Sequence, residues 1–168
     1  VHPDYGTPGI MASTGSLGHG LGMVAGMALA SLNQKKYFYV LLSDGELQEG
    51  SVWESALIIS SLKLNNVIVV VDNNGLQSST RAKDTHPTLY PIDKKFASFG
   101  WNVAKCNGHD SKDIYKKIKS RSLNKPFALI AKTIKGYPVS FMQDVPEWHY
   151  KSPNKSEYLR AIMEINNL

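Results

Sequence analysis

Nine residues near the middle of the chain decide the fold class: Val67-Ile68-Val69-Val70-Val71-Asp72-Asn73-Asn74-Gly75. The first five are apolar and β-branched, which is typical of a strand covered on both faces of a parallel sheet. A polar turn follows at once, so the strand is predicted to end near Asp72. A second apolar run, Tyr37 to Leu42, also predicts a buried strand, and it ends in Ser43-Asp44-Gly45-Glu46.

Helix and strand patterns alternate on both sides of these two strands. Apolar spacing predicts helices over 17–32, 50–63, 110–123 (capped by Asp110 or Ser111) and 156–165, and further strands over 101–106 and 127–132. Loops are expected over 1–15, 72–90 and 135–153, which are rich in Pro, Gly and polar residues. The alternation predicts an α/β fold, a doubly wound and mostly parallel sheet with helices on both faces, forming a single domain over 1–168.

Composition narrows the class of protein. The 168 residues are 42% hydrophobic and 20% charged, as expected of a soluble globular domain. No apolar run reaches the roughly 18 residues that span a bilayer, so we expect no membrane association and a cytoplasmic location. The net charge is +5, and the basic residues cluster mostly over 112–125, where they are expected to form the solvent-exposed face of a helix. This arrangement argues against nucleic-acid binding. The single cysteine, Cys106, excludes an internal disulfide.

The two strand ends are the candidate site. Ligands of open parallel sheets bind beyond the carboxyl ends of the strands, so Asp44 and Asn74 would meet at one edge if their strands are neighbours. Carboxylate and amide oxygens suit Mg²⁺ or Ca²⁺, and Gly45 would let a phosphate approach the backbone. A helix beginning near Glu49 adds N–H groups that favour an anion. The alternative is that Asp44 only caps the next helix and that Asn74 belongs to an ordinary turn.

The spacing of these residues resembles the signature of thiamine diphosphate enzymes, in which Asp44-Gly45 is followed by Asn73-Asn74. Within that superfamily, the stretch Ser43 to Glu54 is similar to transketolases, as are 13–20 and 107–110. The stretches 132–136 and 146–149 resemble the N-terminal subunits of two-chain transketolases. Ser43 departs from the usual glycine, with little expected consequence unless the position needs a positive φ.

The resemblance implies roles for particular residues. Asp44 and Asn74 would give side-chain oxygens to the metal, and Leu76 its backbone carbonyl. The backbone of Gly45 and Glu46 would approach the diphosphate.

Other implied roles lie in loops. Gly15 and Leu17 would line the aminopyrimidine pocket, His2 would reach the hydroxyls of the substrate, and His149 would lie near the diphosphate. Glu49 would lie at a subunit interface and couple two active sites, the alternative being a solvated glutamate that favours a helix N-terminus.

The same resemblance implies an activity. It is the transfer of a two-carbon ketol unit between sugars or sugar phosphates, with thiamine diphosphate carrying the chemistry. The carboxylate that activates the cofactor would come from a separate, C-terminal pyrimidine-binding subunit. A heterotetramer built on a homodimer is expected.

Three alternatives remain open at this stage. Gly20-Leu21-Gly22-Met23-Val24-Ala25 fits the G-x-G-x-x-A fingerprint of an NAD-binding dehydrogenase, although that motif should follow a strand and here follows a loop. The chain could be a non-catalytic partner that kept the fold. A component of a 2-oxoacid dehydrogenase is the third possibility, and 46–54 resembles it less.

Overall fold

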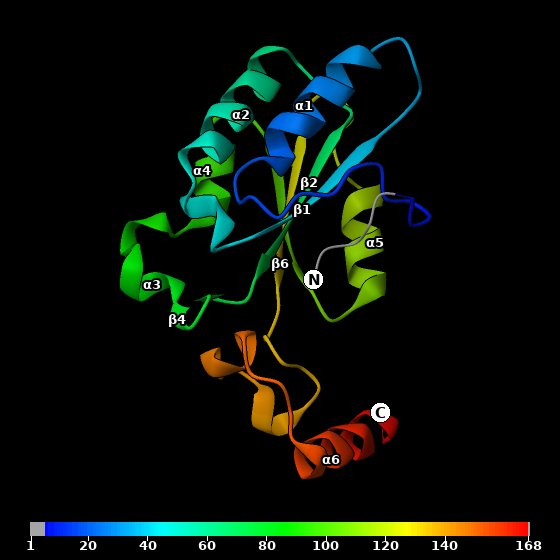
Figure 1. Ribbon diagram of the computed structural model, residues 1–168. Coiled ribbons are helices and arrows are strands. Elements are labelled where there is room, and N and C mark those ends of the chain that lie inside the picture. Colours follow the sequence, from blue (N-terminus) through cyan, green and yellow to red (C-terminus); the bar gives the residue numbers. More distant parts are fainter. Residues whose placement is uncertain (1–5, 168) are drawn as a thin grey trace.

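The computed structural model describes residues 6–167 (Figure 1). Its main elements are α1 (Gly20–Ala30), β1 (Phe38–Ser43), α2 (Gly50–Ser61), β2 (Val67–Asn73), β3 (Leu76–Gln77), β4 (Thr80–Arg81), α3 (Ala82–Thr85), α4 (Ile92–Ser98), β5 (Asn102–Asn107), α5 (Ser111–Lys119), β6 (Phe127–Lys132) and α6 (Lys155–Asn166). Single 3-10 turns are η1 (Glu46–Gln48), η2 (Pro87–Leu89), η3 (Ser140–Met142) and η4 (Pro146–His149).

The central sheet has four strands in the order β1-β2-β6-β5, and every pair is parallel. In its register Ser43 lies opposite Asp72, and Lys132 lies between Asn73 and Asn107. All four strands therefore end at the same edge of the sheet, and the two predicted site segments leave it from adjacent strands.

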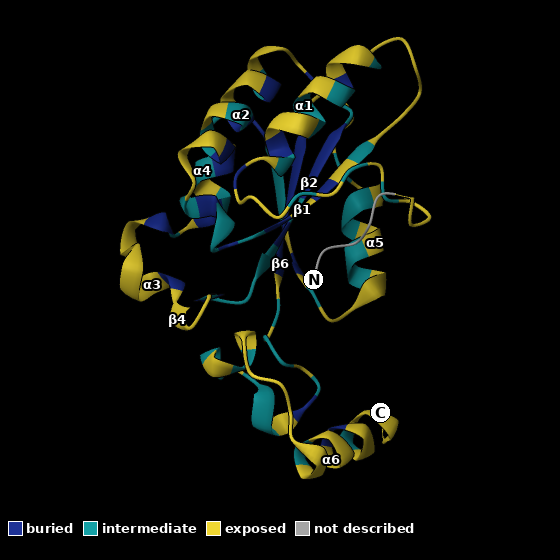
Figure 2. Cartoon of the chain, viewed as in Figure 1, coloured by how far each residue is buried: buried dark blue, intermediate teal, exposed yellow. Residues whose placement is uncertain are grey.

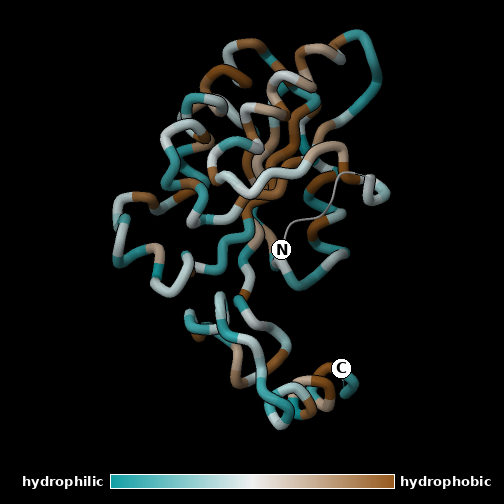
Figure 3. Tube along the Cα trace, viewed as in Figure 1, coloured by the Kyte–Doolittle hydropathy of each residue, from teal (hydrophilic) through white to brown (hydrophobic). Residues whose placement is uncertain are grey.

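Helices cover both faces of the sheet, as the α/β prediction requires (Figure 1). On one face α1 packs on β1 and β2, α2 lies against α1, and α4 packs on β5 and β6. These elements share one core cluster, which includes Val40, Leu42 and Val69. On the other face α5 packs on β5 and β6, where Phe127 and Leu129 are buried. Figures 2 and 3 show the strands as a buried, hydrophobic band between helices whose outer sides are exposed. The doubly wound fold is confirmed.

The helix between β5 and β6 begins where the sequence predicts. Asp110 is its N-cap, and one carboxylate oxygen accepts the N–H groups of Lys112 and Asp113 at 2.9 and 3.2 Å. These bonds satisfy two backbone donors that a helix start otherwise leaves free.

The prediction for 72–90 as a plain loop is wrong in part. A short antiparallel hairpin, β3 with β4, forms directly after β2, and α3 follows it. The sequence did not predict α4, which has only seven residues and follows Pro91. Its apolar face rests on just Ile92 and Phe96, too short a pattern to show a helical period.

The irregular stretch predicted over 135–153 is confirmed and contains η3 and η4. With α6 it extends beyond the carboxyl edge of the sheet (Figure 1). None of the helices that the structure describes is long and apolar enough to cross a membrane.

The fingerprint considered for NAD has the wrong surroundings. Gly20 and Gly22 lie within α1, and residues 6–19 contain no strand that could lead into it. A dinucleotide-binding glycine turn must follow a strand, so that alternative is not supported.

Candidate functional site

Asp44 is the centre of the site. It directly follows β1 and is fully buried, at 0% relative exposure. Its Oδ2 accepts the Gly75 N–H at 2.6 Å and the Tyr90 hydroxyl at 3.0 Å, and its Oδ1 accepts the Gly45 N–H at 3.0 Å. The Gly75 contact brings the turn after β2 against the carboxylate, which is the juxtaposition expected of neighbouring strands.

Burial governs the electrostatics of this carboxyl group. Desolvation raises the pKa of Asp44, opposed by hydrogen bonds from Gly75, Tyr90 and Gly45, while the nearby Asp72 raises it further. Burial and the adjacent Asp44 also raise the pKa of the Tyr90 hydroxyl, which therefore remains a donor. A buried anion without a cation is costly, so a positive charge at this point would be stabilised.

The turn after β2 is ordered by its own side chains. Asn74 accepts the Leu76 N–H through Oδ1 at 2.8 Å, and Gly75 has a φ of +81° that favours glycine. Leu76 is almost fully buried, so its main chain is what it offers to a ligand. Asp44, Asn74 and Leu76 are thus gathered by Gly75 into one small region.

Gly45 makes close approach possible. A Cβ at this position would lie 2.8 Å from Cβ of Gln77 and 3.8 Å from the carbonyl oxygen of Leu76. The φ and ψ of Gly45, −61° and −41°, are open to any residue, so space rather than conformation requires glycine here. Gln77 Oε1 is buried and has no hydrogen-bond partner among the described residues, leaving a free acceptor beside the turn.

A large groove opens on the other side of Glu46. It has a volume of about 960 Å³ and is lined by β1, α1 and the loop over residues 9–17, with Gly15, Leu17, Glu46 and Asp72 among its walls. Leu17 is 55% exposed there. The structure therefore brings Gly15 and Leu17 to the same groove as Glu46, next to the buried Asp44.

Gly18 connects the loop over residues 9–17 to Glu46 and Ser51 through backbone hydrogen bonds. Its N–H donates to Glu46 Oε1 at 2.9 Å, and its carbonyl accepts from Ser51 Oγ at 2.9 Å. Its φ is +82°, and a Cβ would clash with Ser51 Oγ, so both conformation and space require glycine. The sequence reading did not single out this residue, although it lies within the motif over 13–20.

The remaining predicted residues lie in three places. Glu49 is the exposed N-cap of α2, with no hydrogen bond from its side chain to the helix start. His149 ends η4, where Nδ1 lies 3.1 Å from Lys135 Nζ and the ring meets Tyr150 edge-on. His2 lies outside the described residues.

Tyr150, the residue after His149, contacts the segment that follows β2. The hydroxyl of Tyr150 lies 3.4 Å from Ser78 Oγ, just beyond Gln77. Desolvation and the ammonium of Lys135 lower the pKa of His149, which favours a neutral imidazole. Because a charged lysine can only donate, it directs Nδ1 to accept and leaves the proton on Nε2.

Some contributors were missed by the sequence reading. Tyr90 binds Asp44 from 46 residues away, and Thr133, at the end of β6, donates to Asp72 Oδ1. Tyr90 has no local motif and reaches Asp44 from the segment between η2 and α4. Thr133 lies in the stretch 132–136 noted for its family resemblance, but its contact with Asp72 depends on β6 lying next to β2 in the sheet.

The donor set fits a hard divalent cation and a diphosphate. Among residues 6–167, no three His, Cys, Asp or Glu side chains gather as a metal site. The expected set needs only one carboxylate, one amide oxygen and one carbonyl, with phosphate and water completing an octahedron. The narrow space at Gly45 and the buried charge of Asp44 agree with such a group.

Comparison with known proteins gives consistent results. The family described as "Transketolase, thiamine diphosphate binding domain" matches residues 1–163. The chain is similar to an apulose-4-phosphate transketolase subunit of Actinobacillus succinogenes, with 42% identity over 99% of this chain and 61% of that protein. It is 37% identical to the subunit of the same name from Phocaeicola vulgatus, over 98% of this chain and 60% of that protein.

Larger relatives and a solved structure agree. Human transketolase is 37% identical over 91% of this chain and 25% of its own length. The crystal structure of transketolase from Campylobacter jejuni superposes with a TM-score of 0.85 and 25% identity, covering 98% of this chain and 27% of that one. The chain spans about three fifths of the two apulose-4-phosphate transketolase subunits. On the family match over nearly all of its length, the chain belongs to the transketolase thiamine diphosphate-binding domain family.

Proposed function

We propose that this chain is the diphosphate- and metal-binding part of a transketolase-type transferase that moves a two-carbon ketol unit between sugars or sugar phosphates. The observation that carries the proposal is the buried Asp44 carboxylate, held against the turn after β2 by the 2.6 Å bond from Gly75. In support of it, Asp44 and Asn74 follow adjacent parallel strands, and the chain belongs to this family.

In this proposal Asp44 and Asn74 give side-chain oxygens to Mg²⁺ or Ca²⁺, and Leu76 gives its carbonyl oxygen. Supporting this, Leu76 O faces the narrow space at Gly45. The N–H groups of Gly45 and Glu46 would meet the diphosphate at the start of η1. When bound, thiamine diphosphate supplies a nucleophilic carbon and an electron sink, and the chain holds it in place.

Gly15 and Leu17 would contact the aminopyrimidine ring, since they line the groove beside Glu46. His149 would donate from Nε2 to the diphosphate, a direction favoured by Lys135 at Nδ1. His2 would contact substrate hydroxyls, and Glu49 would lie at an interface and couple two sites, in line with its exposure and missing cap bond.

We further propose that the partner is a pyrimidine-binding subunit, in a heterotetramer built on a homodimer. Apolar side chains on the groove side, such as Leu41 at 72% exposure, suit contact with another chain. The relatives that are themselves named as transketolase subunits point the same way. A single domain over 1–168 and a cytoplasmic location belong to the same proposal.

The metal role is tested by calorimetric titration of thiamine diphosphate with and without Mg²⁺. Asp44→Ala and Asn74→Ala should each weaken Mg²⁺-dependent binding more than about 100-fold, since removal of mere supporting groups costs about 10–100-fold. The matched control is Asp84→Ala, on exposed α3, which should bind as the wild type does. Equal binding by Asp44→Ala and Asp84→Ala would refute the assignment.

Activity is tested by adding a pyrimidine-binding chain encoded beside this one. Ketol transfer should appear only in the mixture and should disappear with Asp44→Ala. Cofactor binding without any transfer in the mixture would instead favour the non-catalytic alternative.

A further inference from the structure

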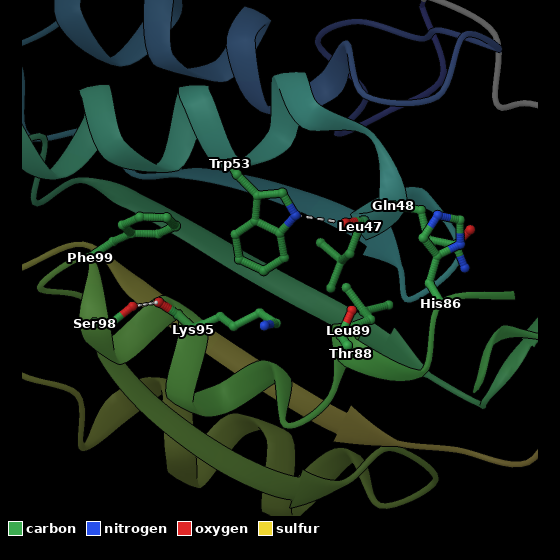
Figure 4. Close-up of a pocket in the computed structure, with 9 residues that line it drawn as sticks. All are labelled: Leu47, Gln48, Trp53, His86, Thr88, Leu89, Lys95, Ser98 and Phe99. Carbon is green, nitrogen blue, oxygen red and sulfur yellow. Dashed lines mark hydrogen bonds between the residues drawn. The ribbon is translucent and has the colours of Figure 1, made fainter. Parts of the chain in front are cut away.

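A second pocket opens beside Leu47 and Leu89, which are close in sequence to Glu46 and Tyr90. It has a volume of about 440 Å³ and opens between the η1–α2 corner and the η2–α4 segment (Figure 4). It shares no lining residue with the groove. The volume is within the range of pockets that bind small molecules.

The lining combines flat apolar walls with cationic and hydroxyl groups. Trp53, Phe99, Leu47 and Leu89 form the apolar part. The polar part comes from Lys95, His86, Gln48, Thr88 and Ser98, and no acidic residue is among the nine that line the pocket. This charge pattern suits a ligand with a planar apolar body and a negative group.

The aromatic wall is held in a fixed orientation. Trp53 donates its indole N–H to the carbonyl oxygen of Leu47 at 2.7 Å, and its ring lies 5.9 Å from that of Phe99 at an angle of 48°. Figure 4 shows both rings beside the pocket. Because the indole N–H is already bonded, Trp53 offers a ring surface rather than a donor to a ligand.

Lys95 is the lysine of this pocket and would pair with the negative group of a ligand. Its side chain extends along the pocket toward Thr88 and Leu89 (Figure 4), and its ammonium has no ion pair or hydrogen bond within residues 6–167. The neighbouring Lys94 is on the same helix but does not line the pocket. A carboxylate beside Lys95, with Thr88 as a second donor, would form a charge-assisted pair at the end of the aromatic wall.

We propose that this pocket binds a small aromatic carboxylate, with its ring against Trp53 and Phe99 and its carboxylate on Lys95. The site is distinct from the proposed metal and cofactor site, because none of its lining residues belongs to that set.

The test is an NMR titration of the ¹⁵N-labelled chain with 2-naphthoate. The Trp53 indole and the Ser98 and Phe99 amide signals should shift in a saturable way, and the distant Trp148 indole should not. Lys95→Gln should weaken binding roughly tenfold, the scale of one charge-assisted hydrogen bond. Lys94→Gln is the matched control and should bind as the wild type does.

Two further ligands distinguish the contribution of the carboxylate from that of the aromatic ring. The neutral 2-naphthamide should bind at least several-fold more weakly, and inorganic phosphate alone should not shift the Trp53 indole. The proposal is overturned if 2-naphthoate gives no saturable shift, or if the amide binds equally well. It is also overturned if phosphate reproduces the shifts, or if the two lysine variants behave alike.

Discussion

Replacing Gly45 by alanine tests whether the site depends on close approach. The added methyl carbon would lie 2.8 Å from Cβ of Gln77, whereas carbon atoms in contact prefer about 3.5–4.0 Å, so about 0.7 Å or more must be made up by movement. Overpacking of this kind costs about 1–3 kcal/mol. Since the backbone of Gly45 is helical, alanine also gains about 0.4–1 kcal/mol by restricting the unfolded chain.

The two effects leave a net loss of about 1 kcal/mol in the free energy of unfolding, measurable by urea denaturation. Binding should suffer more, because the displaced segment carries the Leu76 carbonyl, 3.8 Å from the new methyl position. We expect Mg²⁺-dependent affinity for thiamine diphosphate to fall about tenfold or more. Calorimetry on the folded variant measures this separately from stability.

Two controls isolate the cause. Gly50→Ala, at the first residue of α2, meets nothing within 4 Å and should stabilise the chain by about 0.4–1 kcal/mol. In the Gly45→Ala background, Gln77→Gly removes the clashing carbon and should restore part of the binding, whereas Gln77→Ala keeps it and should not. If Gly45→Ala is as stable as the wild type and binds the cofactor equally well, the site has more room than this reasoning allows.

Three further changes test other contacts by urea denaturation. Asp110→Ala should destabilise the chain by about 1 kcal/mol through loss of the α5 cap, and an unchanged midpoint would contradict that role. Tyr90→Phe should cost about 1–3 kcal/mol without metal, because the buried Asp44 loses a donor; a cost below about 0.3 kcal/mol would show that bond to be unimportant. Lys105 lowers the pKa of Asp93, so their ion pair stabilises the fold above the unfolded pKa and is lost as the pH falls through the lower folded pKa. The stability difference between wild type and Lys105→Gln, about 0.2–1 kcal/mol for an exposed pair, should therefore be constant near neutral pH. It should begin to fall near the ordinary pKa of an aspartate and vanish once the pH lies below the lowered pKa of Asp93; a difference that stays unchanged through this range would contradict the ion pair.

The centre of the sheet was predictable because β2 and β6 are buried on both faces, whereas β1 exposes Tyr39 and Leu41 on one face. In β2 and β6 nearly every position is apolar, a pattern that only a covered parallel strand needs. The polar residues after β1 and β2 then mark the ligand edge without any knowledge of the helices. The strand order itself was not predictable, and it is the order β1-β2-β6-β5 that brings Thr133 to Asp72.

The parts that the sequence did not reveal depend on contacts between distant segments. Tyr90 is an unremarkable aromatic residue in the chain, and its role follows from packing that carries its hydroxyl to Asp44. Likewise, His86 has no motif, but the folding of η2 against η1 places it in the second pocket. Short elements such as α4 lack enough turns to show a helical period, so tertiary packing decides them.

Ser43 shows how a departure from the family pattern can matter in an unexpected way. The described non-glycine residues with positive φ are Lys63, Ser78 and Asp144, so the serine at 43 brings no backbone strain. Its hydroxyl, however, accepts the Glu46 N–H at 3.1 Å, a group proposed to meet the diphosphate. Binding through that N–H would exchange one hydrogen bond for another, and the gain would be the difference between a phosphate oxygen and a hydroxyl as acceptor. Because charged acceptors form the stronger bond, by about 1 kcal/mol, the exchange favours the diphosphate while keeping the turn ordered before it arrives.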